Sequence, residues 1–356
     1  MLRTEIAQRR LASQALVGSN FDSPVAVVRH MGAMQAQDYG QAVWAVGARC
    51  GASLQKVEAA IASGEIVRTW PMRGTIHFVP REDAAWMLQL LTPRIITADK
   101  RRQERLGLTI SLINRCGEIL QANLNGGKQL TRPQIAELLA KNGIDATGPR
   151  LYHTLWYLSQ VGLICIGPMQ GKQQTFMLLK ELAPNSRKLS REDALAELAK
   201  RYFTSHGPAT IADFANWAGI GLTIAREGLA FVKGGLTSVT VDEKTYWFAS
   251  SVLSSAQQSV LLLPGFDEYL LGYKDRSAVL ELVHAGKVVP GGNGVFKPMV
   301  VLNGEVVGTW KRTVKKAAVH IAIDLFTPVT LPQDLLAKAV QQYGDFLNLP
   351  TELIVH

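Results

Sequence analysis

Two glutamines on either side of one small apolar residue are the first feature of this sequence that suggests chemistry. Gln35, Ala36 and Gln37 follow a predicted amphipathic helix that begins at Pro24. Residues two positions apart face opposite ways on a helix and the same way on an extended chain. We therefore expect the helix to end or unwind near Gln35 if the two amides act together. The alternative is that these amides cap the C-terminus of the helix.

Asp267 and Glu268 are a second candidate, because neighbouring carboxylates are typical of general acid–base sites. Support of the local fold is the alternative role for both side chains. Asp38 follows the glutamine pair directly. It either takes part in the same chemistry or caps the next helix.

The composition indicates a cytoplasmic protein with an anionic partner. The 356 residues include 38 Lys and Arg against 29 Asp and Glu, a formal net charge of +9. Nucleic acid is the first candidate partner, although many ordinary cytosolic proteins are also basic. No apolar run approaches the ~18 residues that span a bilayer, and the N-terminus lacks an apolar signal core. The 3 cysteines fit a reducing compartment and lack the spacing of zinc ligands, so we expect neither a metal nor another cofactor.

The elements that must position the glutamine pair follow a recurring order, in which two helices precede a two-stranded hairpin. In the first copy, helical patterns come before strands predicted at 66–70 and 75–79. In the second copy, a capping box at Thr131 and a helix at 150–160 precede strands at 163–166 and 175–178, with a wing between them. In the third, a helix at 207–217 and one capped by Thr223 precede strands at 236–241 and 245–249. This order is typical of winged helices in tandem.

The composition changes toward β structure after residue 250. Short apolar or β-branched runs predict strands at 259–263, 287–289, 299–302, 305–310 and 319–325. Asn303 and Gly304 indicate a hairpin between two of them, because both turn positions need a positive φ. We therefore expect an α+β chain with three tandem winged-helix modules, at 1–105, 106–186 and 187–250, followed by a small β-barrel or half-barrel at 251–356.

Five blocks of sequence resemble the AlkZ/YcaQ superfamily of helix-turn-helix DNA glycosylases. They lie at 34–38, 41–45, 67–77, 262–276 and 308–312, in the order found in that family. The essential motif of the family is Gln, an apolar residue, and then Gln or Asp. It falls on Gln35, Ala36 and Gln37, which is similar to the Gln-containing, AlkZ-like branch linked to azinomycin-like crosslinks.

The resemblance implies tandem winged helices and a β-barrel curved around DNA, and removal of alkylated purines, including the unhooking of interstrand crosslinks, without a metal. An N7-alkylguanine is positively charged and therefore an activated leaving group. Two neutral amides then suffice to place a water and to stabilise an oxocarbenium-like sugar. We expect a monofunctional glycosylase that hydrolyses the N-glycosidic bond of bulky or crosslinking N7-alkylguanine. The alternatives are a non-enzymatic winged-helix transcription regulator, which would normally bind as a symmetric dimer, and a protein-interaction scaffold.

Basic side chains are expected to hold the phosphates of damaged double-stranded DNA around the neutral glutamine pair. The second helix of a winged helix enters a DNA groove, and in the second module its groove-facing residues would be Arg150, His153, Thr154 and Tyr157. The predicted DNA contacts are Arg73, His77, Arg150, Lys172, Lys274, Arg276, Lys311 and Arg312. A solvated surface is the alternative for such residues. We expect a monomer, located in the cytoplasm at the nucleoid.

Overall fold

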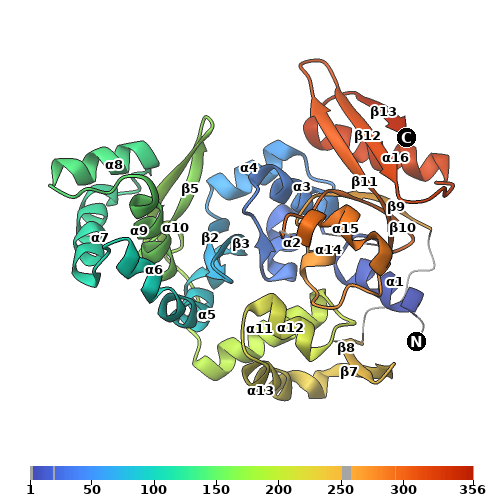
Figure 1. Cartoon of the computed structure of the whole chain (residues 1–356), viewed down its shortest axis with the longest axis horizontal. Coiled ribbons are helices and arrows are strands. Elements are labelled where there is room, and N and C mark those ends of the chain that lie inside the picture. Colours follow the sequence, from blue (N-terminus) through green and yellow to red (C-terminus); the bar gives the residue numbers. More distant parts are fainter. Residues whose placement is uncertain (1–2, 19–20, 251–257, 293, 356) are drawn as a thin grey trace. The chain divides into compact units, whose positions relative to one another are not determined.

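The computed structural model describes residues 3–18, 21–250, 258–292 and 294–355. The chain forms two compact units, whose elements are labelled in Figure 1. The terminal unit combines residues 1–58 and 196–356, and the central unit comprises residues 59–195. The predicted mixture of helix and sheet is confirmed. The division into four parts stays a prediction.

The terminal unit begins with helices and one very short strand. Its first elements are α1 (Arg3–Ser13), α2 (Pro24–Met31), β1 (Met34–Gln35) and α3 (Tyr39–Cys50). Helix α2 begins where the sequence predicted, because the Ser23 side chain accepts a hydrogen bond from the Ala26 amide and Pro24 occupies the first turn. The boundaries with the central unit fall within α4 (Leu54–Ala62) and α11 (Arg191–Ser205).

A helix pair and a hairpin follow α11 in the terminal unit. These elements are α12 (Ile211–Ala218), α13 (Leu222–Val232), the short helix η2 (Lys233–Gly235), β7 (Leu236–Val241) and β8 (Lys244–Ala249). The predicted hairpin is confirmed. The predicted cap at Thr223 is wrong, because the extended residue that precedes α13 is Gly221 and Thr223 already lies in the first turn.

The strands described after residue 258 form a five-stranded sheet in the order β13-β12-β11-β10-β9. They are β9 (Val260–Leu263), β10 (Met299–Leu302), β11 (Glu305–Val314), β12 (Val319–Leu325) and β13 (Thr351–Val355). Asn303 and Gly304 have φ values of 51° and 96° and connect β10 to β11, as predicted. Within the described residues the sheet stays open between its edges β13 and β9, so it is a half-barrel at most.

The strand predicted at 287–289 is wrong. The chain between β9 and β10 contains α14 (Glu268–Leu271), η3 (Leu282–His284), α15 (Ala285–Val288) and η4 (Pro290–Gly292). A short apolar run does not distinguish a strand from a buried helical turn. Val288 lies on α15, and its side chain is fully buried in the core of the terminal unit. The last helix, α16 (Gln333–Leu347), contacts α3 and β9. Its Tyr343 ring lies 4.9 Å from that of Trp44 and 5.0 Å from that of Trp310.

The central unit contains a sheet in the order β3-β2-β5-β6-β4, which joins the hairpins predicted for two separate modules. The pairing of Arg68 with Ile166 links them. The predicted wing is shorter than expected, because both strands extend toward a turn at Gly171 and Lys172. The elements are β2 (Ile66–Met72), β3 (Thr75–Pro80), η1 (Arg81–Asp83), α5 (Ala84–Ala98), α6 (Lys100–Arg105), α7 (Ile110–Leu124), β4 (Leu130–Thr131), α8 (Arg132–Lys141), α9 (Gly148–Gln160), β5 (Ile164–Gln170), β6 (Gln173–Leu178) and α10 (Leu179–Leu182). None of the helices in the described part of the chain is long and apolar enough to cross a membrane.

Candidate active site

The glutamine pair lies on a segment that follows α2, begins with the short strand β1 and bends at Gln37. Gly32 caps α2 with a φ of 78°, and its amide donates to the carbonyl of Val28. A residue with a side chain is strained at such a φ, which explains why glycine ends this helix. Met34 and Gln35 then form β1. The predicted end of the helix before the pair is therefore confirmed.

Side-chain burial alternates along the segment. Ala36 is fully buried, whereas Gln35 is half-buried and Gln37 is exposed. Gln35 and Gln37 are therefore the more accessible side chains on either side of Ala36, which anchors the segment in the core.

The segment ends at Asp38, which caps the next helix. The Asp38 carboxylate accepts a hydrogen bond from the Gln41 amide at 3.1 Å, at the start of α3. The Gln41 side-chain oxygen in turn accepts from the Gly265 amide at 2.9 Å and from Arg312 Nη1 at 3.2 Å. One amide thus links three of the sequence blocks that resemble the glycosylase family.

Gly265 belongs to a tight approach between two loops of the terminal unit. A Cβ at this position would lie 2.5 Å from the carbonyl oxygen of Phe296, a distance that real Cβ atoms do not adopt. Only glycine fits without a backbone shift. The turn it allows delivers Asp267 and Glu268 to the start of α14.

Asp267 is paired with a buried arginine and is not a free acid. Arg49 donates from Nη1 to Oδ2 at 2.9 Å and from Nη2 to Oδ1 at 2.8 Å, and both side chains are inaccessible to solvent. The same arginine donates from Nε to the carbonyl of Gln14 and from Nη2 to its side-chain oxygen, each at 2.9 Å. This bidentate geometry is the strong form of a charged hydrogen bond. Asp267 also caps α14 by accepting from the Tyr269 amide at 2.9 Å.

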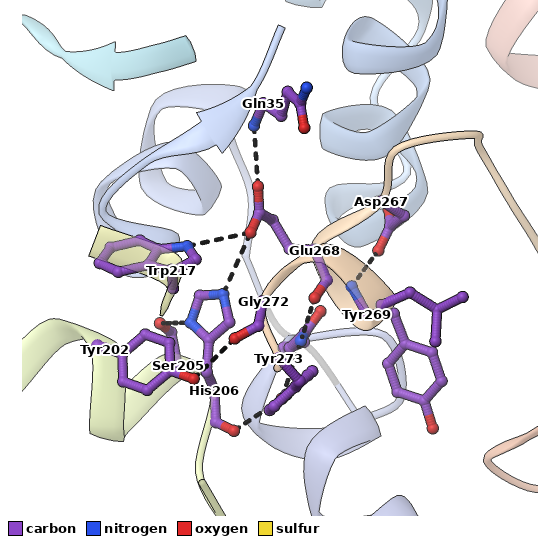
Figure 2. A network of polar contacts seen from close by, with 12 residues as sticks. Gln35, Tyr202, Ser205, His206, Trp217, Asp267, Glu268, Tyr269, Gly272 and Tyr273 are labelled. Atoms are coloured by element: carbon purple, nitrogen blue, oxygen red, sulfur yellow. Dashed lines mark hydrogen bonds and ion pairs between the residues drawn. The ribbon is translucent and has the colours of Figure 1, made fainter. Parts of the chain in front are cut away.

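Glu268 is buried beneath the glutamine segment and contacts its main chain (Figure 2). Its Oε1 accepts from the Gln35 amide at 2.9 Å, and its Oε2 accepts from the indole Nε1 of Trp217 at 3.1 Å. His206 Nε2 lies 3.6 Å from Oε2, which is longer than a hydrogen bond. The candidate carboxylate pair therefore supports the segment and does not itself reach the exposed face.

His206 is held by its other ring nitrogen. Its Nδ1 lies 2.7 Å from Ser205 Oγ, a hydroxyl that also lies 2.8 Å from the carbonyl oxygen of Arg201. Burial lowers the pKa of His206 below its ordinary value of 6.5, against the opposing effect of the Glu268 carboxylate, and the charges of Arg49 and Arg10 lower it further. The imidazole is therefore neutral at neutral pH.

The terminal unit is expected to become less stable in acid because of His206. The folded-state pKa lies below the unfolded value, so the unfolded chain binds the proton more readily. The stabilisation is complete above about pH 6.5 and is lost as the pH falls from there toward the folded-state pKa. Urea unfolding at several pH values between about 7.5 and 5.5 measures how the unfolding free energy changes with pH, and this is the slope to compare between variants. A His206→Gln variant should flatten it only in part, since burial also lowers the pKa of His30; an unchanged slope would contradict the assignment.

Sequence reasoning missed four residues of this network, namely Gln14, Arg49, His206 and Trp217. Arg49 did carry a signal, because it follows Ala42, Ala45 and Val46 on the apolar face of its helix, where a charge implies a buried partner. The other three had no comparable signal. Their role follows from contacts between distant segments. Among the described residues, no group of three His, Cys, Asp or Glu side chains could hold a metal ion.

Four of the predicted DNA contacts lie in the terminal unit. Lys274 and Lys311 are exposed. Arg312 is half-buried and bonded to Gln41, as described above. Arg276 is also half-buried, where its Nε donates to the carbonyl of Leu270 at 2.8 Å and its guanidinium lies 4.9 Å from the centre of the Phe296 ring. Lys274 and Lys311 are thus the most accessible cations of this group.

The other four lie in the central unit. Lys172 is exposed at the β5–β6 turn, and Arg73 and Arg150 are half-buried. His77 is fully buried, with Nε2 at 3.1 Å from Arg73 Nη2, so it does not lie on an outer strand face. The prediction that His153 and Thr154 face a DNA groove is wrong. These residues are 3% and 1% exposed, because α9 packs this face inward, with His153 paired to Asp99 and stacked on Trp156.

Comparisons with known proteins agree with these observations. Residues 28–346 match the AlkZ-like family of DNA glycosylases. The chain is 27% identical over 349 residues to an interstrand DNA cross-link repair glycosylase of Streptomyces sahachiroi, which covers 94% of this chain and 92% of that protein. The solved structure of Streptomyces sahachiroi DNA glycosylase AlkZ superposes with a TM-score of 0.82 at 25% identity, over 99% of both chains. The family match spans most of the chain, including the glutamine segment, and the protein therefore belongs to the AlkZ-like DNA glycosylases.

Proposed function

We propose that this glycosylase hydrolyses the N-glycosidic bond of bulky or crosslinking N7-alkylguanine in double-stranded DNA, with Gln35 and Gln37 as its catalytic pair. The observation that carries the proposal is the accessibility of the two amides, on either side of the buried Ala36. The name of the Streptomyces sahachiroi relative, a cross-link repair glycosylase, supports this substrate class.

The reaction needs little acid catalysis. As the C1′–N9 bond breaks, its electron pair neutralises the positive charge of the alkylated base, which leaves as a neutral purine. The water oxygen forms the new bond to C1′, and its proton passes to solvent. A side-chain carbonyl of Gln35 or Gln37 accepts a hydrogen bond from this water, and its partial negative charge stabilises the oxocarbenium-like sugar.

An exposed pair of amides also suits a substrate that cannot leave the duplex. Most glycosylases rotate the target base fully into a pocket. A crosslinked base is tethered to the opposite strand, so full rotation is not available to it. Gln37 is exposed and Gln35 is half-buried, which is compatible with attack on a base that stays near the helix.

We further propose that the helix–helix–hairpin sequences α8–α9–β5–β6 and α12–α13–β7–β8 are winged helices that hold the duplex, and that the protein acts as a monomer at the nucleoid. The open sheet β9–β13 takes the place of the expected barrel. The DNA contacts proposed are the predicted basic residues that are exposed or half-buried, namely Arg73, Arg150, Lys172, Lys274, Arg276, Lys311 and Arg312. Membership of a glycosylase family favours this enzyme over a non-enzymatic regulator.

A Lys311→Ala variant is expected to bind duplex DNA more weakly irrespective of sequence. Loss of one phosphate contact should reduce the slope of log K against log salt by about 0.9. Fluorescence anisotropy titrations at several salt concentrations measure both quantities. Lys338 is an exposed lysine outside the predicted set, and Lys338→Ala is the matched control. If the slope of log K against log salt is the same for the two variants, Lys311 does not contact a phosphate.

The substrate proposal is tested with three duplexes of one sequence, carrying an unmodified guanine, an N7-alkylguanine or an N7-linked interstrand crosslink. Abasic sites are revealed by alkaline cleavage and resolved on a denaturing gel. We expect release from both alkylated duplexes and none from the unmodified one. Equal release from unmodified guanine, or no release from the alkylated bases, would contradict the proposal.

A further inference from the structure

A buried carboxylate bonds the main chain at Gln35, on the short strand β1. The Gln35 amide donates to Glu268 Oε1 at 2.9 Å across 233 residues of sequence, and Glu268 is only 1% exposed. In Figure 2 the side-chain amide of Gln35 points away from this carboxylate. Glu268 therefore contacts the backbone of the segment and leaves the functional group of Gln35 on the other side.

The carboxylate is itself fixed from several directions. Trp217, on α12, donates to Oε2 from a fully buried indole at 3.1 Å. The carbonyl of Glu268 accepts from Gln14 Nε2 at 3.2 Å and from the Gly272 amide at 2.8 Å. His206 packs against the same site, and a Cβ on Gly272 would lie 2.5 Å from its ring. The two bonds to the carbonyl fix the Glu268 main chain, and rotation of the carboxylate away from Gln35 would break the bond from Trp217.

A fixed amide at Gln35 determines where both glutamines point. The bond orients the peptide plane between Met34 and Gln35, and the direction of each following Cβ depends on that plane. Ala36 is buried on the inner face, so a rotation at Gln35 would also turn Gln37. A misplacement of about 1 Å at a reacting group costs up to about 100-fold in rate. A buried carboxylate is also expensive unless it is paired, and here one of its donors belongs to the catalytic segment.

We propose that Glu268 is the positioning residue of the Gln35–Gln37 pair, and that Trp217 holds Glu268 in place. The inference rests on the proposed function, since it assigns the pair to catalysis. Glu268 does not touch the substrate. It acts through the Gln35 main chain, and the helix α12 is thereby coupled to the geometry of the active site.

Three substitutions in the full-length chain test the proposal. Trp217→Phe removes the indole donor and keeps a buried aromatic ring. Glu268→Met keeps the length of the side chain without an acceptor, whereas Glu268→Gln keeps one carbonyl oxygen for the Gln35 amide. The matched control is Trp86→Phe in the central unit, because the buried Trp86 also donates its indole N–H to a carboxylate oxygen, Asp83 Oδ1 at 2.8 Å.

Two readouts separate positioning from general stability. Hydrogen exchange of the peptide containing Gln35 should accelerate in Trp217→Phe and Glu268→Met and stay unchanged in Trp86→Phe. The single-turnover rate of base release should fall by about 10- to 100-fold in Glu268→Met and less in Trp217→Phe. Glu268→Gln should recover part of the loss. The DNA affinity of all the variants should equal that of the wild type. The rate of base release by the Trp86→Phe control should also equal the wild-type rate.

The outcomes distinguish the two proposals. If folded Trp217→Phe and Glu268→Met show wild-type rates and wild-type exchange at Gln35, the positioning role is overturned. Slow base release by Gln35→Ala and Gln37→Ala would still support the catalytic assignment of the two glutamines. Wild-type rates in the two alanine variants would instead overturn the catalytic pair. If Glu268→Met does not fold, Trp217→Phe decides, because its ring fills most of the same space.

Discussion

A Gln37→Ala variant is expected to release N7-alkylguanine about 100- to 1,000-fold more slowly than the wild type under single-turnover conditions. Gln37 is the more exposed member of the pair, and its amide is uncharged, so its removal deletes a preorganised dipole without changing the attraction to phosphates. The DNA dissociation constant should therefore stay close to the wild-type value. The measurement is base release at saturating enzyme, with the dissociation constant determined separately by anisotropy.

Gln35→Ala is expected to have an effect of the same order, and the double variant should be little slower than the slower single variant. Groups that act together on one water are strongly non-additive. Gln55 is an exposed glutamine on α4 and outside the segment, and Gln55→Ala is the matched control with an unchanged rate. Undiminished release by both single variants would reject the pair, and additive losses would indicate that the two amides perform separate tasks.

Removal of the Arg49 guanidinium is expected to produce the largest loss of stability. Arg49→Met leaves Asp267 buried and unpaired, and breaking a buried pair in this way costs about 3–5 kcal/mol of unfolding free energy. The two carboxylate oxygens and both groups of Gln14 lose their guanidinium donors together, and only the Tyr269 amide still donates to Asp267. Urea unfolding at neutral pH measures the change. Because Asp267 precedes Glu268, the variant should also lose glycosylase activity.

The exposed pair Glu137–Lys141 provides the comparison. Its side chains are 66% and 70% exposed, and exposed ion pairs contribute little. Lys141→Ala should therefore leave the unfolding free energy almost unchanged. If Arg49→Met were as stable as Lys141→Ala, the buried pair would have no structural role. An Arg49→Met, Asp267→Leu double variant should recover part of the loss, since no charge remains unpaired.

Local signals in the sequence were sufficient to predict much of the secondary structure. The Ser23–Pro24 start of α2, the capping box at Thr131 and the turn at Asn303 each depend on neighbours within four residues. The extended glutamine segment was predicted in the same way, from the direction of side chains two residues apart. Such features are visible in one sequence because the chain satisfies them without distant partners.

Features that depend on distant partners were not predicted. The bond from Glu268 to Gln35 spans 233 residues, and that from Arg49 to Asp267 spans 218. His153 was predicted to face DNA but lies on the inward face of α9. A polar residue in a helical sequence is assigned to the solvent face unless its buried partner, here Asp99, is known. The pairing of β2 with β5 was missed for the same reason, since nothing within either hairpin specifies its neighbour.

The discontinuous terminal unit has a consequence for protein synthesis. Residues 59–195 form one contiguous unit that emerges from the ribosome as a whole, whereas residues 1–58 share their unit with residues from 196 onward, which emerge later. Gln35 emerges 233 residues before Glu268, a delay of roughly 10–50 s at ordinary elongation rates. A nascent or prematurely terminated chain therefore carries the two amides proposed as catalytic without the carboxylate proposed to orient them. The enzyme would become able to cut glycosidic bonds only after Glu268 has been translated.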